Sequence, residues 1–323
     1  MPIVQKSAYP GAPAYLYNGH LQTIFPSIFR NVPDVGYERE RLVLADGDFV
    51  DLDWIKCGQR KLVVLTHGLE GDSRRQYMLG MATLFAGHGW DVLAWNCRSC
   101  SGEMNKSFRL YNHGEIDDIG EVIQHALRTR SYDTVVLVGF SMGGNITLKY
   151  LGVHGRAIPD VIRRAVAISA PADLLASACR LDQPSNRLYR YRFMKKLVRK
   201  LRQKADLFPG TLDMQKLKEV TVWRDFDNFF SAPVNGYRDA DDFYTQASAV
   251  NYMPGIIVPT LVLNAQNDPI LSPECSPAWL AGKHPHIYLE TPRSGGHVGF
   301  VVARDPHTYA ERRTLSFATD PLD

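Results

Sequence analysis

Apolar runs and amphipathic segments alternate along most of the chain, and this alternation predicts a sheet covered by helices. The apolar runs have the uninterrupted character of strands that are buried on both faces of a parallel sheet. They lie at 62–65, 91–95, 135–140, 165–169, 260–265 and 286–289. Helical spacing of apolar residues occurs between them at 77–85, 116–127, 146–151, around 278–280 and at 309–317. We therefore expect an α/β fold with a mostly parallel sheet and helices on both faces.

Two further segments near the start of the chain alternate between apolar and polar residues. Residues 42–44 and 49–54 flank an Asp46-Gly47 turn, which is a strong hairpin signal. The hairpin predicts two antiparallel strands at one edge of the sheet, and it brings the expected number of strands to eight.

The alternation pauses between about residues 171 and 250, where no buried strand is apparent. We interpret this stretch as an inserted helical cap. Residues 1–40 are rich in proline and aromatic residues, so we expect an extended N-terminal arm with one short helix, in which His20 is structural. All of residues 1–323 are expected to form one domain, because a chain of this length can bury a large α/β core.

Composition places the chain among ordinary globular proteins. It is 45% hydrophobic and 22% charged, and the formal net charge of +3 is too small to suggest nucleic acid. No apolar run is long enough to span a membrane, and the first six residues lack the layout of a secretory signal. The five cysteines are scattered, and the C-x-x-C formed by Cys97 and Cys100 lacks a second ligand pair. We therefore expect a cytoplasmic protein without a disulfide framework.

Candidate chemistry is centred on Gly139-Phe140-Ser141-Met142-Gly143. An apolar strand leads into this Gly-x-Ser-x-Gly motif and a helical pattern follows it, which is the context of a nucleophile elbow. The turn is expected to strain the backbone of Ser141 and to expose its hydroxyl. Gly139 and Gly143 are expected where a side chain would collide as the strand and the helix pass each other. The alternative is a glycine-rich turn with a helix-capping serine.

A serine hydroxyl needs a general base, and the base needs an acid that holds its tautomer. In sheets with a nucleophile elbow, the chain order is serine, acid, histidine. Asp268 follows the strand at 260–265, and His297 follows the next strand. Each has a structural alternative, Asp268 as a turn former before Pro269 and His297 as a packed side chain. We predict Ser141, Asp268 and His297 as catalytic residues that need no metal and no cofactor.

An oxyanion intermediate also needs backbone N–H donors. One candidate is the N–H of Met142, directly after the serine. The other is the N–H of Leu69 in the His-Gly-Leu-Glu-Gly loop at 67–71, which follows an earlier strand. The residues that support this loop are His67 together with Gly68 and Gly71, which are expected to let it turn sharply.

Together these motifs resemble the α/β-hydrolase superfamily, and within it the YheT-like esterase group, related to ABHD1/ABHD3-type lipid hydrolases and medium-chain acyl-alcohol transferases. The resemblance covers nearly the whole chain and rests on the motifs at 18–23, 67–71, 139–145, 224–227 and 294–300. It implies a Ser-Asp-His triad, at Ser141, Asp268 and His297. Relatives usually have Phe or His at the position of Cys97 and Gly at that of Ser99, so a different pocket wall is expected there.

The cap contains a basic segment, residues 187–204, that has many cations and no acids. One stripe at helical spacing is traced by Leu188, Tyr191, Lys195, Val198 and Leu201-Arg202. Two interpretations stay open, a cap helix with a solvated basic face and a surface that contacts anionic lipid. No DNA-binding motif or aromatic platform supports a nucleic-acid partner.

The sequence therefore predicts a serine esterase that acts on carboxylic esters with a short- to medium-chain apolar acyl group, a class that includes lipid esters, through an acyl-enzyme on Ser141. Two alternatives remain. An acyltransferase would form the same acyl-enzyme and pass the acyl group to an alcohol. A non-catalytic binding protein would keep the hydrolase fold without the reaction.

Overall fold

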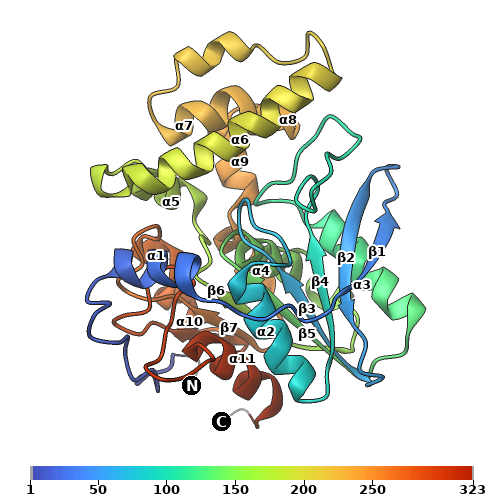
Figure 1. Ribbon diagram of the computed structural model, residues 1–323, viewed down its shortest axis with the longest axis vertical. Helices are drawn as coiled ribbons and strands as arrows, with labels where there is room; N and C mark the ends of the chain where they lie inside the picture. The colour runs from blue at the N-terminus through green and yellow to red at the C-terminus, as the bar shows by residue number, and fades with distance from the viewer. Residues whose placement is uncertain (1–2, 322–323) are drawn as a thin grey trace.

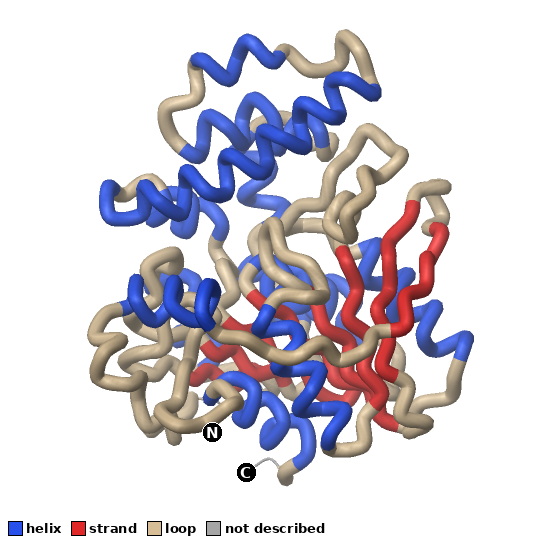
Figure 2. Tube along the Cα trace, viewed as in Figure 1, coloured by secondary structure: helices blue, strands red, loops and turns tan. Residues whose placement is uncertain are grey.

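The computed structural model describes residues 3–321, so the first two residues of the expected arm and the last two of the expected domain lie outside it. Eight strands form one sheet in the order β1-β2-β4-β3-β5-β6-β7-β8 (Figure 2). Their bounds are β1 Glu38–Val43, β2 Phe49–Ile55, β3 Lys61–Thr66, β4 Asp91–Asn96, β5 Thr134–Phe140, β6 Ile162–Ile168, β7 Thr260–Leu263 and β8 Ile287–Glu290. The β1–β2 and β2–β4 pairs are antiparallel and the other pairs are parallel, which confirms the predicted sheet with its antiparallel edge.

Helices cover both faces of this sheet (Figure 1). One face packs against α2 (Gln76–Gly87) and α11 (Tyr309–Thr319). The other packs against α3 (Asp117–Thr129), α4 (Met142–His154) and α10 (Ala278–Ala281). Successive side chains of a strand point to opposite faces of the sheet. When helices cover both faces, the side chains on each face must therefore be apolar. In β3, Val63 belongs to one apolar core and Val64 to the other, which explains the continuous apolar runs of the sequence.

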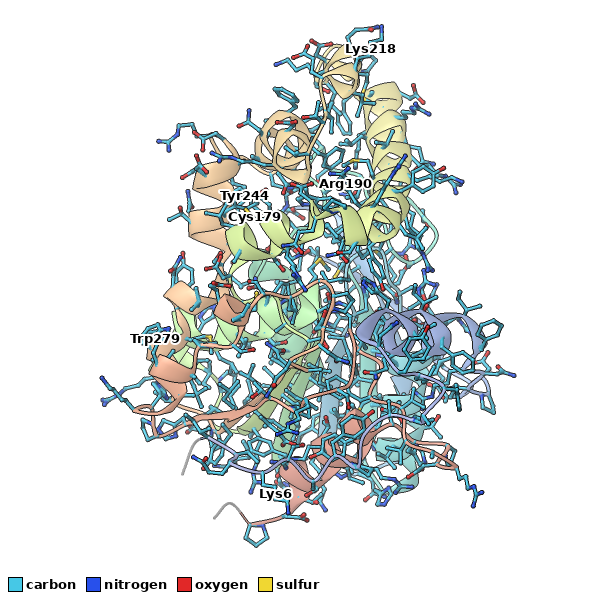
Figure 3. The ribbon with its side chains drawn as sticks, turned by 90° about the vertical axis from the view of Figure 1, so that its left-hand side faces the viewer. Lys6, Cys179, Arg190, Lys218, Tyr244 and Trp279 are labelled. Atoms are coloured by element: carbon cyan, nitrogen blue, oxygen red, sulfur yellow. The ribbon has the colours of Figure 1, made fainter. Side chains whose placement is uncertain are left out.

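Residues between β6 and β7 form a separate layer of helices above the carboxyl edge of the sheet (Figure 1), and we call residues 171–250 the cap. Its helices are α5 Leu174–Leu181, α6 Arg187–Leu207, α7 Trp223–Phe226, α8 Ala232–Val234 and α9 Ala240–Ala247, with a π-helical turn at Asp227–Ser231. Figure 3 shows this layer from the side, with Arg190 and Tyr244 inside it and Lys218 at its outer end. The cap has apolar clusters of its own, which include Trp223 and Phe243.

Shorter helical segments complete the chain. The N-terminal arm contains α1 (Gly19–Phe29), whose N-terminus is capped by the side chain of Asn18. Single 3₁₀ turns lie at Gly155–Ala157, Pro184–Asn186, Met214–Lys218, Ala249–Asn251, Met253–Gly255 and Pro273–Cys275. Within residues 3–321, no helix combines the length and the hydropathy needed to cross a membrane.

The stripe predicted along α6 is wrong at its N-terminal end, whereas its members Val198 and Leu201 do pack inward. Leu188 and Tyr191 are 62% and 64% exposed, so they point away from the protein. The inward face of the helix carries Tyr189, Phe193, Lys196, Leu197, Lys200, Leu201 and Lys204. Lysine has a long apolar stem that can be buried while its ammonium group finds a polar partner. The predicted stripe therefore missed the inward lysines Lys196, Lys200 and Lys204.

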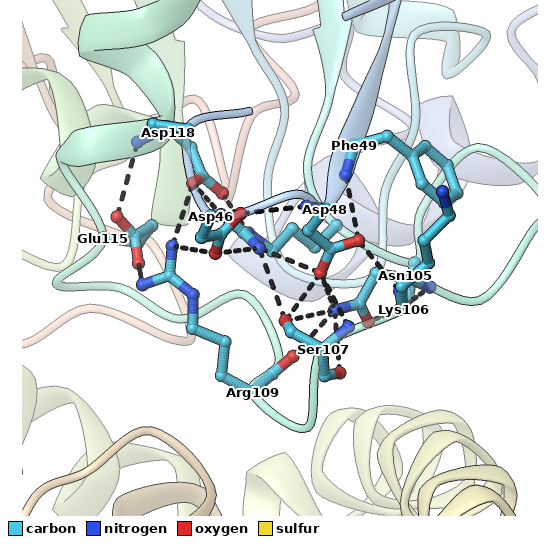
Figure 4. Close-up of polar contacts among 12 residues, drawn as sticks. Asp46, Asp48, Phe49, Asn105, Lys106, Ser107, Arg109, Glu115 and Asp118 are labelled. Carbon is cyan, nitrogen blue, oxygen red and sulfur yellow. Dashed lines mark hydrogen bonds and ion pairs between the residues drawn. The ribbon is translucent and has the colours of Figure 1, made fainter. Parts of the chain in front are cut away.

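The loop after β4 is anchored by a buried ion network around Arg98. Figure 4 shows its acidic partners Asp46, Asp48 and Asp118. The Arg98 guanidinium is 1% exposed and pairs with Asp118 at 2.7 Å, Asp48 at 2.9 Å and Asp46 at 2.8 Å. An arginine at this depth requires such partners, because an unpaired buried charge is strongly destabilising. The network fixes the loop against the β1–β2 hairpin.

The neighbouring cysteines are free thiols. Burial raises the pKa of Cys97 well above its usual value and that of Cys100 to about 11. A thiol with a raised pKa forms little thiolate at neutral pH and is a poor nucleophile.

Candidate active site

Ser141 lies at the tight junction between β5 and α4. Its backbone angles, φ 52° and ψ −118°, are strained for a residue with a side chain, as predicted for an elbow. The junction is closed by backbone packed on backbone. A Cβ atom on Gly143 would lie 2.2 Å from the carbonyl oxygen of Thr66, and one on Gly139 would lie 2.1 Å from that of Gly143. Both positions therefore require glycine.

The side chains of Ser141, His297 and Asp268 form one hydrogen-bonded chain. His297 Nδ1 lies 2.8 Å from Asp268 Oδ2, and His297 Nε2 lies 2.9 Å from Ser141 Oγ. An ionised carboxylate only accepts hydrogen bonds, so the Asp268 contact places the ring proton on Nδ1. His297 Nε2 is then free to accept the proton of the serine hydroxyl. This is the arrangement that activates a serine as a nucleophile.

Asp268 is held in place by its own loop. Its Oδ1 atom accepts hydrogen bonds from the backbone N–H groups of Ile270 at 2.8 Å and Leu271 at 3.2 Å. The side chain is 1% exposed, and that of His297 is 10% exposed. The carboxylate therefore has fixed donors on one oxygen and the imidazole on the other.

Helix α1 of the arm stabilises the two loops that carry Asp268 and His297. Gln22 Oε1 accepts hydrogen bonds from the N–H of Gly295 at 2.8 Å and from Asn267 Nδ2 at 2.9 Å. Thr23 Oγ1 accepts one from the N–H of His297 at 2.8 Å. Sequence reasoning placed these residues in a packed arm and missed this role. The Gln-Thr pair of the 18–23 motif was the only available signal.

His20 of the same helix contacts the cap instead. Its Nδ1 atom lies 3.2 Å from the hydroxyl of Tyr189, and the two rings are stacked. This contact fits the structural role expected for His20 and joins the arm to α6.

The 67–71 loop passes directly beside the serine. His67 is fully buried, and its Nε2 atom accepts a hydrogen bond from the N–H of Cys97 at 3.0 Å. The proton is therefore on Nδ1, which donates to the Gly68 carbonyl oxygen at 2.8 Å. Burial lowers the pKa of His67 to about 4, so the ring stays neutral and holds the loop to the end of β4.

The two glycines of this loop act differently from the prediction. Neither has a positive φ, and the sharp turn is made at Glu70, whose φ is 55°. A Cβ atom on Gly68 would lie 3.1 Å from Ser141 Cβ, and one on Gly71 would lie 2.7 Å from the Tyr77 hydroxyl. The glycines therefore permit close approach, and they are not what turns the loop.

The candidate oxyanion donors both lie next to Ser141. Met142 is the first residue of α4, where helical geometry leaves the backbone N–H without an intrahelical acceptor. Leu69 lines the same cavities as Ser141. Within residues 3–321, its N–H has no acceptor. These two donors are therefore free to bind an incoming oxygen atom.

Two cavities meet at Ser141. The first, which we call the mouth, opens between α1 and α6 and is lined by Ile24, Ser27, Arg75, Arg192, Ser141 and His297, among others. The second, the inner cavity, lies under the cap and is lined chiefly by apolar residues such as Leu174, Leu181, Phe193, Trp223, Phe243 and Ile270. A further apolar cavity around Leu201, Phe226 and Phe230 shares Leu69, Trp223 and Phe243 with the inner one.

Besides His297 and Tyr244, two titratable side chains line the inner cavity, Asp227 and His113. Burial raises the pKa of Asp227 to about 6, although a hydrogen bond from the Tyr244 hydroxyl at 2.8 Å works against the shift. Burial lowers the pKa of His113 to about 4. Both shifts favour the uncharged form, as expected for groups surrounded by apolar side chains.

The different pocket wall expected around Cys97 and Ser99 is not observed. Neither residue lines the mouth, the inner cavity or its extension. Cys97 is buried in the main core, and Ser99 hydrogen-bonds with Asn105. The buried ion pairs of Arg98 hold this loop against the hairpin and away from the serine.

Comparison with known proteins identifies the family to which this fold belongs. The α/β hydrolase fold family matches residues 61–303. The putative esterase YheT of Escherichia coli (strain K12) is 32% identical over 314 residues, which cover 95% of this chain and 92% of YheT. The phospholipase ABHD3 of Mus musculus is 28% identical over 323 residues, which cover 96% of this chain and 78% of that protein.

A solved structure has the same fold. The esterase Pf2001 of Pyrococcus furiosus aligns with a TM-score of 0.58 at 17% identity and covers 87% of this chain and 90% of its own. The match to the family extends over most of the sequence, and YheT is similar along nearly its whole length. The chain therefore belongs to the α/β-hydrolase fold family, and esterases of the YheT type are among its relatives.

Proposed function

We propose that the protein is a serine esterase that hydrolyses carboxylic esters through an acyl-enzyme on Ser141. The observation that carries this proposal is the hydrogen-bonded chain through His297, with contacts of 2.8 Å to Asp268 and 2.9 Å to Ser141. The esterase relatives support the same reaction class.

In the proposed mechanism, Ser141 Oγ attacks the ester carbonyl carbon while its proton passes to His297 Nε2. Asp268 holds the imidazole and stabilises the imidazolium that forms. The N–H groups of Leu69 and Met142 donate to the oxyanion of the tetrahedral intermediate. The intermediate collapses, and the leaving alcohol takes the proton from Nε2. Water then attacks the acyl-enzyme by the same steps and releases the acid.

The inner cavity is the proposed site of the acyl chain. Its lining is mostly apolar, it begins at Ser141, and it continues toward Leu201 and Phe230 under the cap. Burial of each methylene group in such a cavity contributes about 0.8 kcal/mol. The mouth would then hold the alcohol part of the ester. A lipid ester fits this division, and one relative is named a phospholipase.

We also propose that the protein contacts an anionic lipid surface with the rim of the mouth. Lys195, Arg199 and Arg202 on α6 are exposed, and none forms an ion pair with another residue that the structure describes. Exposed apolar side chains lie on the two helices that border the mouth, with Tyr191 on α6 and Phe29 on α1 at 64% and 66% exposure. Cations with neighbouring apolar groups are typical of surfaces that bind membrane interfaces.

A panel of p-nitrophenyl esters of graded chain length tests the reaction and the acyl site. We expect kcat/KM to rise with acyl length and then fall once the chain exceeds the inner cavity. Turnover must disappear in Ser141→Ala. Acyl transfer to an added alcohol would instead support the acyltransferase alternative, and absence of any turnover across the panel would count against the proposal.

A further inference from the structure

The residue after Leu69 has an unusual conformation and environment. Glu70 has a φ of 55°, in the left-handed region that non-glycine residues rarely adopt, and it is only 9% exposed. Its carboxylate accepts a hydrogen bond from the Tyr111 hydroxyl and forms an ion pair with Lys200 Nζ at 2.9 Å. A strained backbone persists only where the surroundings hold it.

The backbone of Glu70 is held just as completely. Its N–H donates to the Tyr111 hydroxyl at 3.1 Å. Its carbonyl oxygen accepts hydrogen bonds from Lys196 Nζ at 2.9 Å and from Arg75 Nη2 at 3.2 Å. Two of the groups that fix Glu70, the ammonium groups of Lys196 and Lys200, therefore come from the cap.

Three lysines of α6 reach the body of the protein from one face of the helix. Lys196, Lys200 and Lys204 are spaced four residues apart, so they lie in one row. Lys204 Nζ is directed to a different loop, where it donates to the carbonyl oxygens of Asn105, at 2.8 Å, and Ser107. Lys196 and Lys200 thus contact the 67–71 loop, whereas the buried Lys204 contacts a different loop.

Lys200 is charged in this setting. Burial lowers its pKa, but the neighbouring Cys100 and Glu70 outweigh that effect and raise it. Its ammonium group also lies 4.6 Å from the centre of the Tyr111 ring, which favours the cation. The ion pair with Glu70 is therefore a charged contact between the cap and the loop that carries Leu69.

We propose that Glu70 and Lys200 are positioning residues, and that their ion pair couples seating of the cap to the geometry of the Leu69 oxyanion donor. This inference rests on the proposed function, because it assigns the Leu69 N–H to the oxyanion site. When α6 moves away from the body, Glu70 loses its contacts with Lys196 and Lys200. Without them, the left-handed backbone of Glu70 can relax. The Leu69–Glu70 peptide rotates and shifts Leu69, so that the Leu69 N–H leaves its position beside Ser141. The oxyanion site is complete only under a closed cap.

The test compares Lys200→Met with Lys204→Met, two substitutions of inward lysines on the same helix face. Both variants are assayed with p-nitrophenyl butyrate, by thermal unfolding, and by inhibition with an aliphatic trifluoromethyl ketone, which forms a tetrahedral adduct on serine. We expect Lys200→Met to lower kcat about tenfold to a hundredfold, in the range of a weakened oxyanion donor, with little change in KM. The inhibition constant should rise by the factor by which kcat/KM falls. Lys204→Met should reduce thermal stability but keep kcat within about twofold.

Two further variants separate positioning from folding. Lys200→Arg keeps the charge and should recover most of kcat. The double variant Glu70→Gln/Lys200→Met leaves no unpaired buried charge, so it should fold even if Lys200→Met does not. We expect its kcat to stay as low as that of Lys200→Met, since residues that act as one unit are non-additive.

The proposal is overturned if Lys200→Met and the double variant turn over the ester at the wild-type rate. It is also overturned if Lys204→Met loses kcat to the same extent as Lys200→Met, because the effect would then be structural. Failure of the proposed function looks different, since the wild type itself would give no turnover that depends on Ser141.

Discussion

The nucleophile elbow and the cap are attached to the same sheet in different ways. At the elbow, backbone packs on backbone so closely that a single added carbon on Gly143 would lie 2.2 Å from the Thr66 carbonyl oxygen. The cap helix α6 stands away from the sheet, and the long side chains of Lys196, Lys200 and Lys204 contact loops of the body. The elbow is fixed by backbone packing that leaves no room for an added atom. Helix α6 is held by long side chains that can change conformation.

This difference separates two requirements of the proposed reaction. The nucleophile must keep its position through every turnover, and the close backbone packing at Gly139 and Gly143 keeps it rigid. The cavity under the cap must admit and release a substrate, and contacts made through flexible side chains can break and form again. The 67–71 loop lies between the two regions, since His67 joins it to β4 and Lys200 joins it to the cap.

The largest expected effect comes from the proposed catalytic side chains. We predict that Ser141→Ala, His297→Ala and Asp268→Asn each lower kcat on the order of a thousandfold or more, while thermal unfolding changes little. Adding His297→Ala to Ser141→Ala should cost almost nothing further, because the residues act as one unit. Steady-state kinetics of the single and double variants measure this. Wild-type rates in Asp268→Asn would require another acid.

The rigidity of the elbow can be tested at its tightest glycine. We predict that Gly143→Ala destabilises the protein by about 3 kcal/mol, because the added carbon forces strand and helix apart. Gly87→Ala is the matched control, since a Cβ atom there meets nothing within 4 Å. Denaturant titration of both variants gives the comparison. Equal stability of the two variants would mean that the elbow is looser than described.

Acid–base behaviour of the cap gives a medium-sized effect. The pKa of Asp227 is raised to about 6, so its carboxylate forms in the inner cavity as the pH rises from 5 to 7. We predict that the ratio of kcat/KM for octanoate over acetate esters falls severalfold over that range, because the charge opposes an apolar chain. The ratio cancels the proton transfers common to both esters. In Asp227→Asn, the ratio of kcat/KM for the two esters should not change with pH. If the ratio falls equally in the wild type and in the variant, Asp227 is excluded as the cause.

The same carboxyl predicts the sign of a stability change. Between about pH 4 and 6 the folded protein binds the Asp227 proton and the unfolded chain does not, so wild-type stability falls as the pH rises through that window. Relative to Asp227→Asn, the wild type should therefore lose stability from pH 4 to 6. Urea titrations at the two pH values check this, and a relative gain would contradict the assignment.

The smallest effect on chemistry is expected at the outer face of α6. We predict that Lys195→Gln, Arg199→Gln and Arg202→Gln together weaken binding to anionic vesicles by up to about 1 kcal/mol per cation at low salt. Turnover of a soluble ester should stay within about twofold, because these side chains line neither the mouth nor the inner cavity. Co-sedimentation at low and high salt measures binding. Unchanged sedimentation would leave the face as a solvated part of the cap.

The same contrast explains what could be predicted from the sequence. The strands of the body were predictable because burial on both faces makes them continuously apolar, and the glycine pattern around Ser141 follows from close packing. The orientation of α6 was not, because lysine is usually exposed, and here Lys196, Lys200 and Lys204 point inward. A signal was present in their four-residue spacing and in the absence of acids to pair with them.

Contacts between distant parts of the chain were also hidden. Gln22 meets a loop 273 positions away, and Glu70 meets Lys200. Neither contact leaves a local pattern of hydrophobic and polar residues. The glycines at 67–71 predict a sharp turn at Gly68 and Gly71, but the turn is made at Glu70, whose tertiary contacts hold its left-handed backbone.

The most direct test of the account is covalent labelling with a fluorophosphonate, followed by mass spectrometry of the intact protein and of its peptides. The account predicts one adduct per chain, located on Ser141, and no labelling of Ser141→Ala or of wild-type protein that is denatured before the reagent is added. An adduct on another residue, or ester turnover by a protein whose Ser141 stays unlabelled, would contradict it.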